Sequence, residues 1–166
     1  TAVGRDPRLV GDVTASGANT RCRLPERLIY PTIKEVARSI ALHYEHGGEP
    51  LEAFIIDVKA AHKRVKVAEA DGGLQFFQLG DSLYHYRCNS FGAKWSAFWW
   101  GRTGAALHRV LHGLLWHRHF GFLYVDDWIF LSPASSCQDH LTLCLAMLGV
   151  LGCPLSLSKV RLGTRV

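Results

Sequence analysis

The sequence predicts an α+β protein with antiparallel strands and three helices. Short runs of β-branched, aliphatic and aromatic residues are bounded by turn residues, which is typical of strands. Longer segments instead repeat their apolar residues at helical spacing. The predicted helices cover residues 32–45, 96–115 and 138–151, and the predicted strand runs lie near 54–58, 64–69, 74–79, 83–87 and 122–131.

Length and composition limit the classes of protein that need to be considered. A chain of 166 residues with 48% apolar residues is sufficient for one domain with a core. The net charge of +5 permits a polyanionic partner without requiring one.

The five cysteines form no CxxC pair, so we expect reduced thiols rather than disulfides or a zinc knuckle. The chain has no signal-peptide pattern and no apolar run long enough for a membrane span. We therefore expect an intracellular piece of a longer polypeptide, in the cytoplasm or the nucleus, without a membrane partner.

The N-terminal part of the chain is its most basic stretch. Residues 1–25 are rich in Gly, Arg, Thr and Asn, which predicts loop or extended structure. A solvated surface explains each arginine singly, whereas the cluster also fits a surface that faces phosphates. The cluster consists of Arg5, Arg8, Arg21, Arg23 and Arg27.

The first helix is marked by a capping box. Thr32 and Glu35 have the spacing at which each side chain bonds the other residue's backbone N–H. Ile33, Val36, Ile40 and Tyr44 then form an apolar stripe, and Gly47-Gly48 ends the helix.

The middle of the chain is predicted to be a β-meander. The segment Asp71-Gly72-Gly73 has hairpin-turn chemistry between strands at 64–69 and 74–79. Gly80-Asp81 turns the chain again, into an alternating strand at 83–87. A basic group precedes this meander and consists of Lys59, His62, Lys63, Arg64 and Lys66.

The two later helices follow from periodicity. In the first, Gly101 and Gly104 each lower helix stability by about 1 kcal/mol relative to alanine. His108 and His112 share one face of this helix, but no glutamate follows His108 as in HExxH, so we favour packing histidines over a zinc site. The tryptophans of this region fit core packing or base stacking. The last helix ends at Gly152 and Pro154, and residues 155–162 are predicted to be extended.

Asp126 and Asp127 stand between two strand-forming runs, which predicts a tight hairpin with both carboxylates at or beside its turn. Two carboxylates about 4 Å apart repel by roughly 1 kcal/mol in water and by more in a partly dry site. A magnesium ion with oxygen ligands would remove this repulsion. A solvated turn is the alternative, because aspartate is common in turns.

Asp57 interrupts the apolar run Phe54–Val58. A carboxylate in a buried strand must be paired, protonated or bound to a cation. If this strand neighbours the hairpin in one antiparallel sheet, Asp57, Asp126 and Asp127 converge at one edge, as a two-metal phosphoryl-transfer site requires.

At these positions the sequence resembles the reverse transcriptases of retrotransposons. Tyr124-Val125-Asp126-Asp127 resembles the YxDD hairpin of that family, and Phe54 to Ala61 resembles its first aspartate motif. The run Phe91 to Phe98 is similar to the motif that opens the long palm helix. Two further likenesses are weaker. Arg8 to Asp12, with Asn19 downstream, resembles a fingers segment, and Pro154 to Lys159 resembles the segment after the last palm helix.

The resemblance implies a right-hand polymerase palm, an antiparallel sheet backed by helices, with partial fingers at 1–45, a palm at 46–166 and no thumb. It implies RNA-directed DNA synthesis on an RNA or DNA template with a primer, using dNTPs and two Mg²⁺ ions, with Mn²⁺ as a substitute. The implied metal positions are Asp57, Val58, Asp126 and Asp127, with Lys159 as a further catalytic residue that protonates the pyrophosphate. The implied nucleotide-binding residues are Arg8, His62, Phe91, Gly92 and Lys94.

The sequence also departs from the family. His62 stands where a Tyr or Phe usually excludes the 2′-hydroxyl, which leaves discrimination between dNTP and rNTP open. Ala97 replaces the usual proline of the middle motif. The primer grip and thumb lie beyond Val166 in the family, so we expect little processive synthesis from residues 1–166 alone. RNase H and integrase regions of a parent polyprotein are further expected partners.

Three other interpretations remain at this point. The chain is compatible with a decayed or domesticated palm that binds nucleic acid without catalysis. It is also compatible with another palm enzyme, such as an RNA-dependent RNA polymerase or a nucleotide cyclase, although the Phe91 and Arg8 segments favour reverse transcriptase. The last interpretation is an interaction domain with an accidental acidic turn.

Overall fold

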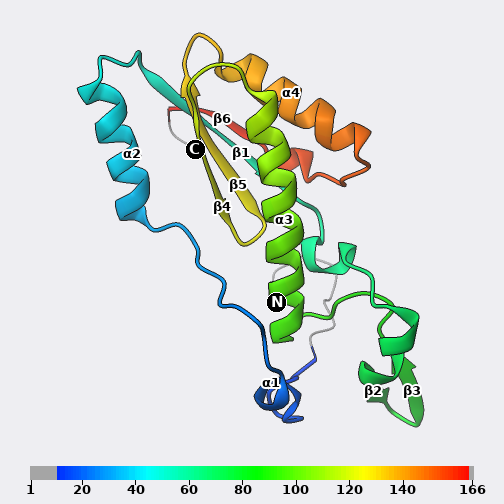
Figure 1. Cartoon of the computed structure of the whole chain (residues 1–166). Helices are drawn as coiled ribbons and strands as arrows, with labels where there is room; N and C mark the ends of the chain where they lie inside the picture. Colours follow the sequence, from blue (N-terminus) through cyan, green and yellow to red (C-terminus); the bar gives the residue numbers. More distant parts are fainter. Residues whose placement is uncertain (1–10, 165–166) are drawn as a thin grey trace, which may run out of the picture. The chain divides into compact units, whose positions relative to one another are not determined.

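The computed structural model describes residues 11–164, and Arg5 and Arg8 lie outside them. The chain falls into two compact units, each built from two separate segments (Figure 1). The first unit combines the described part of Thr1–Arg27 with Ala60–Trp100, and the second combines Leu28–Lys59 with the described part of Gly101–Val166. The predicted division into fingers and palm at residue 45 stays a prediction, because compactness alone does not define those subdomains.

The second unit contains a four-stranded antiparallel sheet in the order β4-β5-β1-β6. Its strands are β1 (Leu51–Asp57), β4 (Phe120–Tyr124), β5 (Asp127–Pro133) and β6 (Arg161–Gly163). β1 and β5 pair over seven residues, from Leu51 opposite Pro133 to Asp57 opposite Asp127. The predicted neighbourhood of the two aspartate-bearing strands is therefore confirmed.

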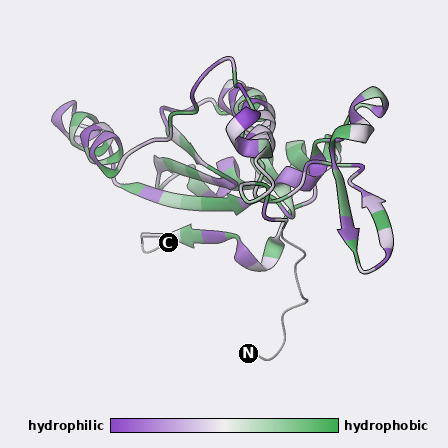
Figure 2. Cartoon of the chain, turned by 90° about the horizontal axis from the view of Figure 1, so that it is seen from below, coloured by the Kyte–Doolittle hydropathy of each residue, from purple (hydrophilic) through white to green (hydrophobic). Residues whose placement is uncertain are grey.

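One face of this sheet holds the core of the second unit. Phe54 and Ile56 of β1 lie opposite Phe130 and Trp128 of β5, and these four side chains are fully buried. Because side chains alternate along a strand, Ile55, Asp57, Ile129 and Asp127 project from the other face, where three of these four residues are only half-buried. Figure 2 shows the mainly hydrophobic colouring of the sheet strands.

Two helices back the core face. In the half of α3 (Lys94–Leu114) that belongs to the second unit, the rings of His108 and His112 lie 5.3 and 5.7 Å from the ring of Phe130. α4 (Cys137–Val150) packs on β1 and β5, and its His140 Nδ1 lies 2.9 Å from Ser132 Oγ of β5. The predicted helices at 96–115 and 138–151 are confirmed within two residues.

Helix α2 (Ile33–Glu45) begins at the predicted capping box, but it does not bury the predicted apolar stripe. Both bonds of the capping box are present, with Thr32 N–H donating to Glu35 Oε2 at 2.6 Å and Glu35 N–H donating to Thr32 Oγ1 at 3.4 Å. The predicted apolar stripe is wrong at its ends, since Ile33 is 87% exposed and Tyr44 is 49% exposed. The helix stands beside the sheet (Figure 1), and its buried residue is His43. His43 Nε2 lies 2.8 Å from Glu49 O.

Replacing Thr32 with alanine is expected to destabilise α2 by about 1 kcal/mol, because an N-terminal N–H loses its acceptor. Urea unfolding or amide exchange in the first turn of α2 measures the loss. Ser39→Ala is the control, because its hydroxyl donates to Glu35 O inside the helix and caps nothing. Equal effects of both changes would contradict the role of the cap.

The first unit is built differently from the predicted meander. Its elements are α1 (Ala18–Arg21), two 3₁₀ helices (Ala61–Arg64 and Glu69–Leu74), β2 (Phe76–Leu79), β3 (Ser82–His85) and the first part of α3. The predicted turn at 71–73 and the strand at 64–69 are wrong, because residues 69–74 close 3₁₀ bonds such as Asp71 N–H to Ala68 O at 2.9 Å. The hairpin turn is at Gly80-Asp81, where Gly80 has φ +61, and the β2–β3 hairpin forms its own sheet.

Two terminal predictions also need correction. The loop expected over residues 1–25 contains the one-turn helix α1, and the extended segment expected at 155–162 contains a 3₁₀ turn at Leu157–Lys159 before β6. All five cysteines are free, as predicted. Among the described residues, no helix combines the length and apolar character needed to span a membrane.

Candidate functional site

The hairpin β4–β5 carries Asp126 in its turn and Asp127 at the start of β5. Tyr124 lies opposite Asp127, so Val125 and Asp126 form a two-residue turn. Val125 has φ +56, a left-handed backbone that β-branched residues rarely adopt. The predicted tight hairpin is confirmed, with Asp126 in its turn and Asp127 beside it.

Asp57 lies directly opposite Asp127 at the end of the β1–β5 ladder. Directly opposite residues on antiparallel strands place their side chains on the same face. The backbone N–H of Val58 donates to Asp126 O at 3.5 Å, which connects the hairpin turn to the end of β1. The structure therefore brings Asp57, Asp126 and Asp127 together at one corner of the sheet, and Val58 joins them through its backbone while its side chain is buried.

Lys159 completes this corner. Its Nζ donates to Asp57 Oδ2 at 2.8 Å, and the Lys159 side chain is 61% exposed whereas that of Asp57 is 6% exposed. The segment before Lys159 is attached to the end of β1, because Lys59 N–H donates to Pro154 O and Ser156 N–H donates to Asp57 O, both at 2.9 Å. These backbone hydrogen bonds thus hold the segment in a position from which the Lys159 ammonium reaches the Asp57 carboxylate.

The carboxylates interact electrostatically. Burial raises the pKa of Asp127, and the charges of Asp126 and Asp57 raise it further, while Lys159 opposes these effects. The hydrogen bond to Asp57 raises the pKa of Lys159, with smaller contributions from the charges of Asp126 and Asp127. Negative charge is therefore concentrated at this corner, and the exposed ammonium of Lys159 neutralises part of it.

The donor atoms at this corner are carboxylate oxygens, which hard divalent ions such as Mg²⁺ prefer. Within residues 11–164, no three Asp, Glu, His or Cys side chains converge closely enough to form a ready metal cage. Lys159 occupies one oxygen of Asp57. The Lys159 side chain is mostly exposed, so its ammonium can leave this oxygen without any loss of core packing.

Tyr30 lies beside this corner, although no sequence pattern indicates it. Its ring lies 5.6 Å from the ring of Tyr124, the first residue of the YVDD run. Burial raises the pKa of Tyr30, and Tyr124 and Asp126 raise it further, so the phenol stays protonated. Tyr30 belongs to a loop without periodicity, and only the tertiary fold places it beside the hairpin.

The described residues predicted to bind nucleotide belong to the first unit. The rings of His62 and Phe91 lie 5.7 Å apart in an edge arrangement, and Lys63 Nζ lies 5.5 Å from the centre of the Phe91 ring. An aromatic surface with an adjacent cation is suited to a nucleotide. Arg8, the predicted triphosphate ligand, lies outside the described residues.

Gly92 and Lys94 are held by Asn19. The Asn19 side chain donates to Gly92 O at 2.8 Å and accepts from Lys94 N–H at 2.9 Å. Gly92 has φ +87, and a Cβ there would lie 2.7 Å from Gly11 O, so this position requires glycine. Asn19 is 6% exposed and fixes the chain where α3 begins.

A group of histidines packs against the core face of the second unit. The rings of His108 and His112 lie 4.5 Å apart, and His112 Nδ1 lies 2.7 Å from His119 Nε2. Burial lowers the pKa of His108 to about 4, with further contributions from His112 and His119. The helix-face pair His108 and His112 is therefore a packing feature in the described structure.

Acidification is expected to destabilise the protein through His108. The unfolded chain binds a proton near pH 6.5 and the folded chain near pH 4, so stability is present above pH 6.5 and falls as the pH is lowered through this window. We expect a loss of about 2 kcal/mol, discounted for partial solvent screening. Urea unfolding at pH 7 and pH 4.5 measures this loss of unfolding free energy.

His108→Leu should reduce the difference in unfolding free energy between pH 7 and pH 4.5. Replacement of the exposed His46 with glutamine should leave that difference unchanged. An unchanged difference in His108→Leu would refute the assignment.

Comparison with known proteins supports the fold. No protein family description matches the sequence, and no curated protein matches it. A foamy viral protease-reverse transcriptase, solved with an RNA/DNA hybrid, has a TM-score of 0.56 at 18% identity over 67% of this chain and 14% of that chain. A Candida albicans telomerase, solved with a TWJ fragment of telomeric RNA, has a TM-score of 0.54 at 13% identity over 82% of this chain and 31% of that chain.

A third similar structure is an apo telomerase of Candida tropicalis truncated from its C-terminal domain, with a TM-score of 0.51 at 13% identity over 79% of this chain and 35% of that chain. The chain thus spans about a third or less of the length of these proteins. At such identities the likeness concerns the fold alone. The predicted α+β class, a palm-like antiparallel sheet backed by helices, is confirmed.

Proposed function

We propose that this chain is the catalytic part of a reverse transcriptase of retrotransposon type, which extends a primer on an RNA or DNA template by two-metal nucleotidyl transfer. The observation that carries the proposal is the pairing of Asp57 with Asp127, with Asp126 in the adjoining turn. A polymerase palm needs two carboxylate-bearing segments side by side. These segments lie about 70 residues apart in the sequence, so an accidental acidic turn does not explain their pairing.

The residues of the corner have distinct proposed roles. Asp57 and Asp126 would hold both ions, with Asp127 contributing mainly negative charge and Val58 its backbone. Bound Mg²⁺, or Mn²⁺ in its place, would lower the pKa of the primer 3′-hydroxyl and stabilise charge on the transferred phosphate. Lys159 would leave Asp57 when the ions bind, and its ammonium would then donate a proton to the departing pyrophosphate.

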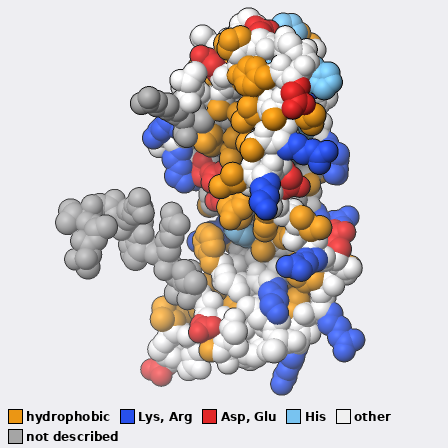
Figure 3. Space-filling view, turned by 90° about the vertical axis from the view of Figure 1, so that its left-hand side faces the viewer, with side chains coloured by type: hydrophobic (Ala, Val, Ile, Leu, Met, Phe, Trp, Pro, Cys, Tyr) orange, Lys and Arg blue, Asp and Glu red, His pale blue; other side chains and the backbone are white. Residues whose placement is uncertain are grey.

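The first unit would supply contacts to the incoming dNTP. His62 would contact the sugar, beside Phe91, while Gly92, Lys94 and Arg8 would contact the nucleotide and its phosphates. Exposed basic residues would attract template and primer, and Figure 3 shows Lys and Arg side chains spread over the viewed face. The proposal further places the protein inside the cell and connects it to a thumb, and to RNase H and integrase regions, in a longer polyprotein.

The test is single-nucleotide incorporation by residues 1–166 on a primer–template, with Mg²⁺ or Mn²⁺. Addition of one nucleotide complementary to the template base supports the proposal. This assay does not require processive synthesis. Template binding without incorporation under either ion would instead support a nucleic-acid-binding palm without catalysis. The ion pair between Lys159 and Asp57 is the observation that favours this second candidate, because it neutralises Asp57 without a metal.

A further inference from the structure

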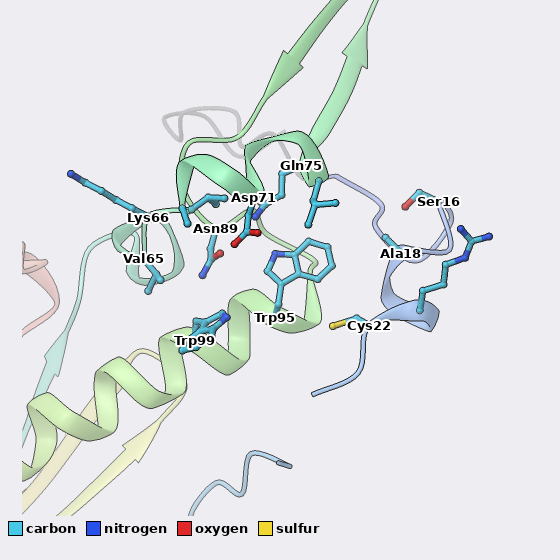
Figure 4. Close-up of a pocket in the computed structure, with 14 residues that line it drawn as sticks. Ser16, Ala18, Cys22, Val65, Lys66, Asp71, Gln75, Asn89, Trp95 and Trp99 are labelled. Atoms are coloured by element: carbon cyan, nitrogen blue, oxygen red, sulfur yellow. The ribbon is translucent and has the colours of Figure 1, made fainter. Parts of the chain in front are cut away.

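The first unit contains a cavity of about 780 Å³ that is separate from the residues proposed to bind dNTP (Figure 4). It lies among α1, the segment 65–68, the 3₁₀ helix Glu69–Leu74 and the first turns of α3. His62, Phe91, Gly92 and Lys94 do not line it. The volume falls in the range of small-molecule sites.

Three polar atoms of the cavity walls are buried without hydrogen-bond partners among the described residues. They are Asn89 Nδ2, Trp95 Nε1 and Gln75 Oε1. Asn89 is only 3% exposed. Folded proteins rarely leave buried polar atoms unpaired, because each such atom has lost its water without compensation. The walls therefore hold unpaired hydrogen-bonding atoms beside the cavity, which a ligand would reach after small side-chain shifts, and the Asp71 carboxylate adds an exposed acceptor.

The cavity also presents flat aromatic surface. Trp95 and Trp99 lie four residues apart on one face of α3, and both side chains line the cavity (Figure 4). Trp99 contacts the Phe98 ring in an edge arrangement at 5.3 Å, and about half of its surface, 51%, is still exposed. A flat ring with donors and acceptors at its edge can stack on an indole and can also form hydrogen bonds with the unpaired polar atoms.

Two cationic side chains and one carboxylate, that of Asp71, line this cavity. Arg21 and Lys66 line the cavity and are exposed, and the Lys66 side chain extends away from the two indoles (Figure 4). Lys63 and Arg64 are exposed close by in sequence. A ligand whose ring enters the cavity and whose anionic group stays outside fits this distribution.

We propose that the cavity binds one purine base of a nucleotide, stacked on Trp99, with its edge bonded to Trp95 Nε1, Asn89 and Gln75. A purine offers more donors and acceptors around its edge, and a larger stacking face, than a pyrimidine. The base comes either from a free nucleotide or from an unpaired position in a single strand. This binding goes beyond the proposed polymerase function and does not depend on it, since no carboxylate of Asp57, Asp126 or Asp127 takes part.

The test follows the five tryptophan indole N–H resonances of residues 1–166 by NMR, in buffer with EDTA, during titration with GMP, AMP, UMP or CMP. Trp95→Phe assigns one resonance. The purine nucleotides should shift the Trp95 and Trp99 resonances more than the pyrimidine nucleotides do. Trp99→Ala should weaken purine binding about tenfold, as expected for loss of one stacking contact.

Trp116→Ala is the matched control, because Trp116 is 57% exposed and lies in the second unit, and purine binding should not change. Gln75→Leu removes an edge contact without removing an aromatic ring, and should also weaken binding. The Asp126→Asn variant should bind purines normally, so a failure of polymerase activity leaves this test intact. Absence of shifts at Trp95 and Trp99, or equal shifts at Trp116, would overturn the proposal.

A second titration distinguishes the sources of the base. A pyrimidine oligonucleotide with one guanine that binds at least tenfold more tightly than GMP identifies a single strand as the ligand, whereas equal affinities identify the free nucleotide. If the all-pyrimidine oligonucleotide binds equally well and shifts the same resonances, the cavity does not read a purine edge and the proposal fails.

Discussion

Asp126→Asn is expected to reduce single-nucleotide incorporation by roughly a thousandfold or more, because a metal ligand and its charge are lost and several kcal/mol of transition-state stabilisation disappear with them. The fold should persist, since Asp126 lies in a turn and its charge disfavours the ionised form of neighbouring Asp127. Incorporation rates and thermal unfolding midpoints of the two proteins measure these effects.

Asp81→Asn is the matched control, because Asp81 is an exposed aspartate at another hairpin turn. It should retain wild-type incorporation. A direct measurement of Mn²⁺ binding by electron paramagnetic resonance should show weaker binding in Asp126→Asn and no change in Asp81→Asn. Full incorporation by Asp126→Asn would exclude the proposed role of this carboxylate.

Phe130→Ala is expected to lower the free energy of unfolding by about 3–5 kcal/mol, the range for removing a large aromatic from a core. Phe130 is completely buried at the centre of β5 and stacks on Phe54 at 5.0 Å between ring centres. The rings of His108 and His112 also pack near Phe130, at 5.3 and 5.7 Å between ring centres. Guanidinium unfolding measures the loss.

Phe76→Ala provides the comparison, since Phe76 is 52% exposed on the β2–β3 hairpin. Its effect should stay below about 1 kcal/mol. If the two variants lost similar stability, the core would not lie on the face of the sheet that carries Phe130.

The elements that the sequence predicted correctly are those with local causes. The capping box at Thr32, the helices α3 and α4 and the Asp126–Asp127 hairpin all depend on residues close in sequence. The turn at 71–73 was wrong because its glycines are equally compatible with the 3₁₀ helix Glu69–Leu74, whose bonds form among neighbouring residues.

The candidate site was predictable only in part. Asp57 stood out as a charge in an apolar run, and Asp126 and Asp127 stood out as adjacent charges between strands. Tyr30 had no such signal, because a loop tyrosine acquires its contacts only when distant segments meet. Asn19 was indicated by the fingers-like segment, but its bonds to Gly92 and Lys94 were not. The exposure of Ile33 likewise depends on which neighbours reach α2, and periodicity does not contain that information.

The left-handed backbone of Val125 affects how precisely the hairpin turn positions Asp126. A valine at φ +56 is strained by on the order of 1–2 kcal/mol, and a glycine there would relieve that strain. A glycine would also widen the range of angles open to the hairpin tip. The branched side chain restricts the backbone angles available to the tip, and this restriction limits the positions that Asp126 can take. Val125→Gly would test this trade between turn stability and preorganisation.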